Sequence, residues 1–422
     1  MAVEPRIRTA PARQGKGLLI PGFVAVLAGV LGTPAAGGAQ SPPTVTLAIE
    51  HVTVLPMDRD TSLADHTVLV SGDRIVWIGP ARTARVPRDA RRVDGGGTYL
   101  IPGLADMHVH LASAEELTAL VSAGVTTVRN MRGAPQHLAW RDSIAQGLLV
   151  GPTIFTSGPS IRRGPLLGRR DARFVFPRTP AEAERLVREQ EAAGYDMIKV
   201  LQGLSRPVYD RLLQTARTAG IPVVGHVVSG IGLEHSLRGG QVSFEHAFDL
   251  HERSRLSATL GREDRAETER DAQALARAGA WVGTIVSSRE GDCAPPTEAE
   301  RAIIGSLVRA RARLLAGSDA GIGEVRAGTG LHCELATLVA AGLTPYQALA
   351  TATVAAGAFV KAHLRRAGTP FGTVTVGSRA DLLLVDSDPR ADIGVVSRPI
   401  GVVLRGAWRP ARVSPASVER RR

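Results

Sequence analysis

The strongest constraint on the fold is a repeated alternation of helices and short strands in the middle of the chain. Between residues 99 and 367, a helical segment repeatedly ends at a small residue followed by glycine, and a short apolar strand comes next. Eight segments have the character of such strands: 103–108, 125–130, 153–158, 197–201, 222–228, 242–248, 281–286 and 314–319. This alternation predicts an α/β fold, a (β/α)8 TIM barrel, whose chemistry would lie at the carboxyl ends of the strands.

The helix boundaries support this alternation. Glycine just past a helix is the usual left-handed cap, and it follows five of the predicted helices: Gly124, Gly194, Gly220, Gly240 and Gly279. Two helix starts show a threonine, then proline, with an acidic or amide side chain three residues after the threonine: Thr179-Pro180 with Glu182, and Thr344-Pro345 with Gln347. These patterns predict capping boxes with proline at the first helical position.

Short β segments flank the predicted barrel at both ends of the chain. Two such flanks can close into one small sheet domain. We therefore predict a small β-sandwich built from both chain ends. The expected order is a signal peptide at 1–39, the N-terminal part of the sandwich at 40–98, the barrel at 99–367, the C-terminal part at 368–413, and a basic tail at 414–422.

The N-terminus is typical of a secretory signal. Four basic residues precede an apolar stretch from Leu18 to Leu31, and Gly37-Gly38-Ala39 fits a cleavage site. The alternative is an uncleaved anchor, for which the apolar stretch is short. We expect an exported protein, periplasmic or secreted, with no stable membrane insertion after signal cleavage.

Export would place the two cysteines in an oxidising compartment. Cys293 follows the predicted seventh strand and Cys333 follows the eighth, so both loops would lie at the same face of the barrel. A disulfide between them is a hypothesis that requires their Cα atoms to lie within about 7 Å.

The net charge of +11 invites a nucleic-acid interpretation. The positive residues are scattered arginines, the only lysines are Lys16, Lys199 and Lys361, and aromatic residues make up only 4% of the chain. Such a chain lacks platforms for stacking bases. We expect a small-molecule substrate and no nucleic-acid partner, and the oligomeric state stays open.

Metal-ligand residue types gather at the carboxyl ends of the predicted barrel strands. His108 and His110 are two residues apart on the first strand, so their side chains point to the same side. Four further candidates lie at the ends of other strands or within one: Lys199, His226, His246 and Asp319. A lone histidine on an apolar run is usually a core residue, but this constellation is hard to obtain from packing. It predicts a metal site.

These residues resemble the amidohydrolase superfamily. The resemblance rests on His108-x-His110 after Ile101-Pro102-Gly103-Leu104, on the strand-four lysine, and on His226, His246 and Asp319. It extends to the C-terminal flank, where 372–374 and 376–384 look like the returning strands of that family's small β-sandwich. The segment 331–345 is similar to the branch that contains imidazolonepropionases and Xaa-Pro dipeptidases.

The resemblance implies two divalent metal ions, taken as Zn²⁺, with Lys199 carboxylated and bridging them. His108, His110 and Asp319 would hold one ion, and His226 and His246 the other. A metal-bridging hydroxide would attack a carbonyl carbon, with Asp319 as the catalytic proton shuttle to the leaving nitrogen. We therefore predict an exported metal-dependent amidohydrolase that hydrolyses an amide, peptide or cyclic amide bond.

Two residues bear on the substrate. Val228 stands two positions after His226, where the Xaa-Pro dipeptidases of this branch tend to carry a tyrosine. Imidazolonepropionases use one metal and lack the bridging lysine, so Lys199 argues against that activity. An ester or a phosphotriester would also fit the same site. The alternative from another class is a catalytically silent barrel acting as a binding protein.

Other polar residues near the predicted strand ends are weaker candidates. Arg129 and the adjacent Asn130 are candidates for binding a substrate carboxylate, and His251 for lining the pocket. His332 and Glu334 are candidates for orienting the ligands, with a helix-start hydrogen bond as the alternative. A positive loop after the third strand would select anionic substrates, unless it is merely solvated: Arg162, Arg163, Arg169, Arg170 and Arg173.

Overall fold

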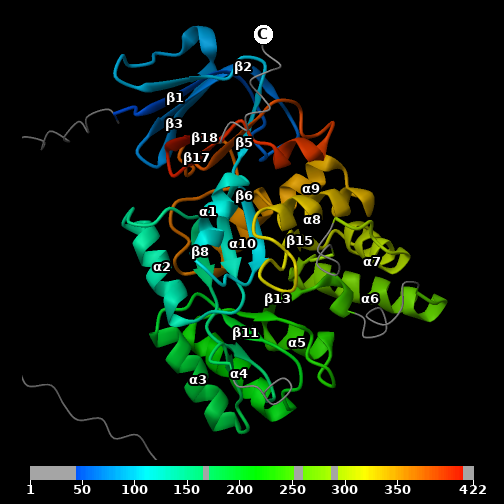
Figure 1. Cartoon of the computed structure of the whole chain (residues 1–422). Helices are drawn as coiled ribbons and strands as arrows, with labels where there is room; N and C mark the ends of the chain where they lie inside the picture. The colour runs from blue at the N-terminus through cyan, green and yellow to red at the C-terminus, as the bar shows by residue number, and fades with distance from the viewer. Residues whose placement is uncertain (1–43, 165–170, 251–259, 287–292, 412–422) are drawn as a thin grey trace, which may run out of the picture. The chain divides into compact units, whose positions relative to one another are not determined.

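Short parallel strands alternate with helices through the middle of the chain (Figure 1). The structure is a computed structural model that describes residues 44–164, 171–250, 260–286 and 293–411. The predicted signal peptide, the basic tail and His251 lie outside these residues. Each of the eight predicted strand segments contains or overlaps an observed strand: β6 (Leu104–Val109), β7 (Val125–Asn130), β8 (Thr153–Thr156), β11 (Ile198–Val200), β12 (Val223–Gly225), β13 (Gln241–Glu245), β14 (Trp281–Gly283) and β15 (Arg313–Leu315).

These strands pair in chain order. One sheet has the order β6-β7-β8, and a second has the order β10-β9-β11-β12-β13-β14-β15, where β9 is Ser160–Ile161 and β10 is Phe174–Val175. Parallel bridges Ser157–Met197 and Val109–Ala320 link the two sheets at both edges. The predicted α/β fold with parallel strands is confirmed, and the pairing is consistent with a barrel.

Helices connect the strands and cover them. They are α1 (Glu115–Ser122), α2 (Pro135–Ala145), α3 (Pro180–Ala192), α4 (Arg206–Ala219), α5 (Leu233–Gly239), α6 (Arg262–Ala278), α7 (Glu298–Arg309), α8 (Thr329–Ala340), α9 (Pro345–Thr351) and α10 (Val354–His363). The five predicted cap glycines all have left-handed φ, between 64° and 93°. Thr179 and Thr344 accept hydrogen bonds from the main chain of Glu182 and Gln347, as predicted. No helix in the described part of the chain is long and apolar enough to cross a membrane.

Strands from both ends of the chain join in one eight-stranded sheet. Its members are β1 (Leu47–Val54), β2 (Leu63–Ser71), β3 (Arg74–Pro80), β4 (Arg91–Asp94), β5 (Tyr99–Pro102), β16 (Leu382–Val385), β17 (Gly401–Leu404) and β18 (Ala407–Pro410). Strands from the two chain ends, including β1, β5, β17 and β18, lie together in Figure 1. The two sets join where β5 pairs with β16 in antiparallel register. Residues 99–102, which the sequence placed at the start of the barrel segment, therefore belong to this sheet.

The predicted disulfide is present. Cys293 follows β14 and Cys333 lies on α8, and their sulfur atoms are bonded with Cα atoms 4.7 Å apart. Glu334 ties the same helix to the end of β14, because its carboxylate accepts hydrogen bonds from Thr284 Oγ1 at 2.5 Å and from Val286 N at 2.8 Å. Helix α8 follows the strand β15. It is thus held to β14 and the segment after it by a disulfide and by the hydrogen bonds of Glu334.

Candidate metal centre

Two histidines at the end of β6 begin the site. His108 lies on the strand, where every residue from Leu104 to Val109 is buried, and His110 follows directly. Their rings are edge to face, with centroids 5.1 Å apart. Gly317 lies against the main chain of His108, where a Cβ atom would come within 2.5 Å of the His108 Cβ. Glycine is therefore required at that position for the two strand ends to approach.

Asp319 joins this histidine pair from the segment after β15. Its Oδ1 lies 2.9 Å from His110 Nε2 and 3.4 Å from His108 Nε2. The residue has a φ of 61°, a left-handed conformation that few residues adopt other than glycine, asparagine and aspartate. Its main-chain N donates a hydrogen bond to His108 O at 2.8 Å, so the strand carrying two histidines also fixes the aspartate.

Three other predicted ligands surround the same centre. The rings of His226 and His246 lie 4.9 Å apart, and those of His246 and His108 lie 5.0 Å apart. Lys199 is 1% exposed, and its charge helps to lower the pKa of His108. The structure therefore brings all six predicted metal-ligand side chains to one place.

The side chains present fit a divalent metal. Ligand atoms of His108, His246 and Asp319 lie within 4.8 Å of one another, the one such group among the described residues. In that same part of the chain, the buried atoms His108 Nε2 and Asp319 Oδ1 have no hydrogen-bond partner, although they face each other. A buried polar pair without hydrogen bonds is costly, and a shared cation would remove that cost.

Protonation of the cluster also suits metal binding. Burial lowers the pKa of His108 well below its ordinary value, and nearby positive charges add to this. Burial also lowers the pKa of His110, against the opposing effect of Asp319. Burial raises the pKa of Asp319, but the close contact with His110 and the surrounding positive charge outweigh this effect and lower that pKa to about 2. Neutral imidazoles and an ionised carboxylate are the forms that ligate metals.

A buried ion pair between Glu245 and Arg129 orients the ring of His108. Glu245, at the end of β13, accepts a hydrogen bond from His108 Nδ1 at 2.9 Å and another from Arg129 Nη2 at 2.7 Å. Its other oxygen accepts a hydrogen bond from the Ser243 hydroxyl. Glu245 and Arg129 are fully buried. Because the Nδ1 proton is held by Glu245, Nε2 of His108 is left to point at Asp319.

A second buried carboxylate fixes the segment that carries Asp319. Asp106, two residues before His108, accepts hydrogen bonds from Ser318 Oγ at 2.6 Å and from Ser318 N at 3.0 Å. Burial is the main reason that the pKa of Asp106 rises to about 7. The sequence analysis missed Asp106 and Glu245, although each lies on a strand within two residues of a predicted ligand.

The sequence pattern of the amidohydrolase family matches residues 99–409. The chain belongs to the amidohydrolase family. The predicted superfamily is therefore confirmed, and with it, at the level of enzyme class, the predicted hydrolase.

Individual relatives of this amidohydrolase carry several names. An adenine deaminase from Deinococcus radiodurans is 29% identical over 352 residues, which are 79% of this chain and 57% of that protein. An imidazolonepropionase from Streptomyces coelicolor is 26% identical over 387 residues, covering 83% of this chain and 94% of that protein. The solved structure of a Xaa-Pro dipeptidase with bound methionine has a TM-score of 0.68 at 19% identity, covering 86% of this chain and 99% of the other, which shows a shared fold. This amidohydrolase spans only 57% of the length of the adenine deaminase.

The structure shows the surroundings of three of the weaker candidates. Arg129 does not face a substrate, because its guanidinium is fully buried and bonded to Met107 O, Ser243 and Glu245. His332 bonds to Ala123 O at the end of α1, at 2.9 Å, so it joins two helices. The described contacts of Glu334 hold the end of β14 and include no predicted metal ligand.

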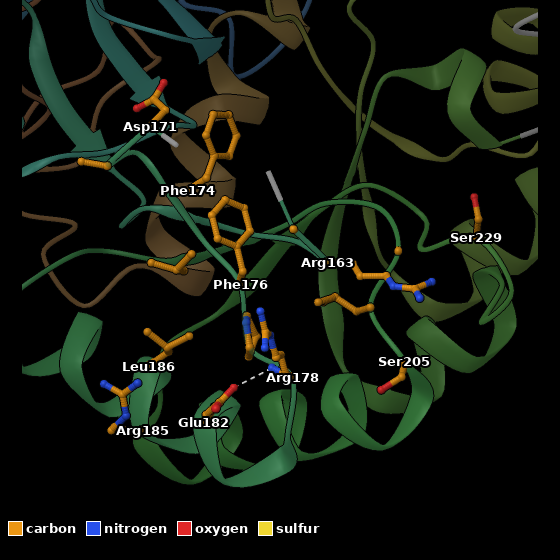
Figure 2. A pocket seen from close by; sticks show the side chains of 16 residues that line it. Arg163, Asp171, Phe174, Phe176, Arg178, Glu182, Arg185, Leu186, Ser205 and Ser229 are labelled. Atoms are coloured by element: carbon orange, nitrogen blue, oxygen red, sulfur yellow. Dashed lines mark hydrogen bonds between the residues drawn. The ribbon is translucent and has the colours of Figure 1, made fainter. Parts of the chain in front are cut away.

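A large groove of about 1480 Å³ opens among the loops that follow β8, β11 and β12. In Figure 2, Phe174 and Phe176 come from one segment of its wall, Arg163 from the loop after β9, and Ser205 and Ser229 from the loops after β11 and β12. In a barrel these loops lie at the same face as the ligand residues. The groove therefore opens at this face and offers space for a substrate, although none of the six predicted ligands is among the residues that line it.

Proposed function

We propose that this amidohydrolase is an exported metal-dependent enzyme that hydrolyses a C–N bond, in an amide, peptide or cyclic amide, of a small molecule. The observation that carries the proposal is the convergence of His108, His110 and Asp319 on one point, with buried ligand atoms that lack hydrogen bonds within the described residues. His226, His246 and Lys199 would complete a site for two divalent ions, taken as Zn²⁺. Such ions supply a nucleophilic water at neutral pH and polarise a carbonyl oxygen.

Asp319 is the proposed proton carrier. Its carboxylate is ionised at neutral pH, since its pKa is lowered to about 2. The residue is 7% exposed. A buried, oriented carboxylate beside the reacting carbonyl can take a proton from the attacking water and release it to the leaving nitrogen. The carboxylate lies 2.9 Å from His110 Nε2 and 3.4 Å from His108 Nε2.

Lys199 is proposed to be carboxylated. It stands on the buried strand β11 with its side chain among groups whose pKa values respond to its charge, including His110 and Asp319. An ammonium beside two divalent ions would be repelled, whereas burial favours the neutral amine, which can add carbon dioxide and become an anion. Arginine could not replace it, because arginine stays protonated.

Export of the protein is part of the proposal. It is supported by the signal-like sequence of residues 1–39 and by the disulfide between Cys293 and Cys333, a bond typical of oxidising compartments. The names of the relatives, adenine deaminase and imidazolonepropionase, support a small-molecule substrate. We also propose that the parallel strands close into a complete barrel and that the sheet built from both chain ends folds into a small sandwich.

The test is a hydrolysis screen of the zinc-loaded protein that starts at residue 40. The panel contains dipeptides, N-acyl amino acids, lactams, esters and phosphotriesters, with Asp319→Asn as the inactive control. Cleavage of a C–N compound by the wild type and not by Asp319→Asn supports the proposal. Faster cleavage of esters or phosphotriesters would replace it, and turnover of nothing in a protein that binds zinc would favour the silent barrel.

A further inference from the structure

Two arginines lie over one phenylalanine ring at the edge of the groove. The guanidinium carbon of Arg132 is 5.7 Å from the centre of the Phe174 ring, and that of Arg162 is 5.8 Å from the same centre. Phe174 itself lines the groove. Both arginines are half-buried, and within the described residues their buried Nε atoms have no hydrogen-bond partner.

The positive charge of this pair is not neutralised by the acid beside it. Two carboxylates raise the pKa of Arg132 through their charge: Asp171 and the predicted ligand Asp319. Asp171 is already bonded through both oxygens to Arg173, at distances of 2.8 to 3.1 Å. Arg132 thus shares the charge of Asp171 with Arg173, and with Arg162 beside them the local charge is positive. Half-buried guanidinium groups with open donors are suited to an anion from outside the chain.

Main-chain contacts hold both arginines in position. The main chain after β7 is fixed to the end of β8, because Gly133 N donates to Gly158 O at 3.2 Å and a Cβ at Gly133 would lie 1.7 Å from Ser157 O. Arg162 N donates to Val175 O at 3.1 Å, which fixes Arg162 alongside β10. A site built on such segments needs little ordering when a ligand binds.

The segment that carries Arg132 also lies beside the metal centre, because Met131 N donates a hydrogen bond at 2.8 Å to the main-chain oxygen of Val109, which stands between His108 and His110. The charge of Arg132 lowers the pKa of His110, and the charge of Asp319 raises the pKa of Arg132. A substrate whose scissile bond lies at Asp319 would therefore place groups a few bonds away within reach of Arg132.

We propose that Arg132 and Arg162 bind a carboxylate of the substrate, so that this enzyme prefers N-acyl amino acids or peptides with a free carboxylate to neutral amides. The inference rests on the proposed hydrolase function and specifies its substrate class. The rest of the substrate would lie in the groove against Phe174 and Phe176 (Figure 2).

The test compares matched pairs of compounds that differ only in charge. N-acetyl amino acids and their carboxamides are assayed with the zinc-loaded protein, and with Arg132→Gln, Arg162→Gln and Arg132→Lys. Each Gln variant is expected to lose about 10- to 100-fold in kcat/KM for the acids, mainly through KM, because a charge-assisted bond is removed. Lysine should recover part of the loss, since it keeps the charge but not the fork.

The controls separate a specific contact from a general field and from misfolding. Arg188→Gln removes an exposed arginine of α3 that is not among the residues lining the groove, and it should change each value by less than about twofold. Slow hydrolysis of the carboxamides should be the same in all variants, which shows that their folds are intact.

Binding is measured separately by calorimetry, with N-acetyl-L-leucine and its carboxamide added to zinc-loaded Asp319→Asn. Equal binding of acid and carboxamide, or an Arg188→Gln effect as large as that of Arg132→Gln, would overturn the anion subsite while leaving the hydrolase intact. If no compound is cleaved but the acid binds in an Arg132-dependent manner, the proposed hydrolysis fails and the subsite stands.

Discussion

Replacing Glu245 by glutamine removes one negative charge from a fully buried position. The substitution leaves the Arg129 guanidinium buried without its partner and weakens the hydrogen bond that orients His108. Breaking a buried pair in this way costs about 3–5 kcal/mol of unfolding free energy. Loss of the group that orients a ligand lowers metal affinity by about 10- to 100-fold. Urea unfolding of the metal-free protein and zinc competition with a chelator measure the two effects.

The control is an ion pair of the same type on the surface. Glu234 and Arg238 are paired on α5 with side chains 79% and 69% exposed, so Glu234→Gln should cost less than about 1 kcal/mol. Combining Glu245→Gln with Arg129→Met should cost less than the sum of the single changes, because no unpaired charge remains. If Glu245→Gln behaves like Glu234→Gln in both assays, the buried pair does not support the site and the reasoning fails.

Further predictions concern the cluster and its surroundings. Asp319→Asn should keep most of the zinc and lose about 10²–10⁴-fold in kcat, measured beside metal content; near-normal turnover would place the proton elsewhere. Lys199→Ala should lose the metal pair and hydrolysis, with partial recovery in acetate or propionate; two tightly bound ions in this variant would refute the carbamate. Cys333→Ser should lower the unfolding free energy by about 2–4 kcal/mol in the oxidised protein, and not in the reduced protein. Because the pKa of Asp106 rises from 3.8 to about 7 on folding, the metal-free protein should lose stability as pH rises from about 4 through 7. Asp106→Asn should flatten that slope in urea titrations at each pH; an unchanged slope would show that other groups cause it.

Local sequence patterns were sufficient to predict the elements of the middle segment. Gly220 and Gly279 end their helices with φ of 64°, a conformation that other residues adopt at a cost. Their positions in the sequence therefore predict where these helices end. The histidine pair on β6 was predictable for a similar reason, since strand geometry places His108 and His110 on the same side. The disulfide followed from the two cysteines lying after neighbouring strands.

The polar layer beneath the ligands could not be predicted in this way. Strand alternation places Glu245 and His246 on opposite faces, yet both contribute to the centre. The reason is the backbone of His246, whose φ of 62° turns its side chain back toward His108. Arg129, at the end of β7, was a candidate for binding a substrate carboxylate, yet its guanidinium bonds to Glu245. The role of such a side chain depends on its hydrogen-bond partners from strands distant in the sequence. Strand periodicity does not predict these partners.

The strained residues at the centre are held by bonds that do not involve a metal. Asp319 costs about 1–3 kcal/mol of strain in its left-handed conformation. Its main-chain N donates to His108 O at 2.8 Å, and His110 N donates to Ala320 O at 2.7 Å. The ligands of β6 and of the segment after β15 therefore position one another through their main chains. Since the ligand set is already assembled, ion binding requires little further ordering of the chain. The affinity for divalent ions then depends chiefly on the negative charge of the ligands. Asp319 and a carboxylated Lys199, the anionic ligands, would therefore contribute more to ion binding than any additional contact.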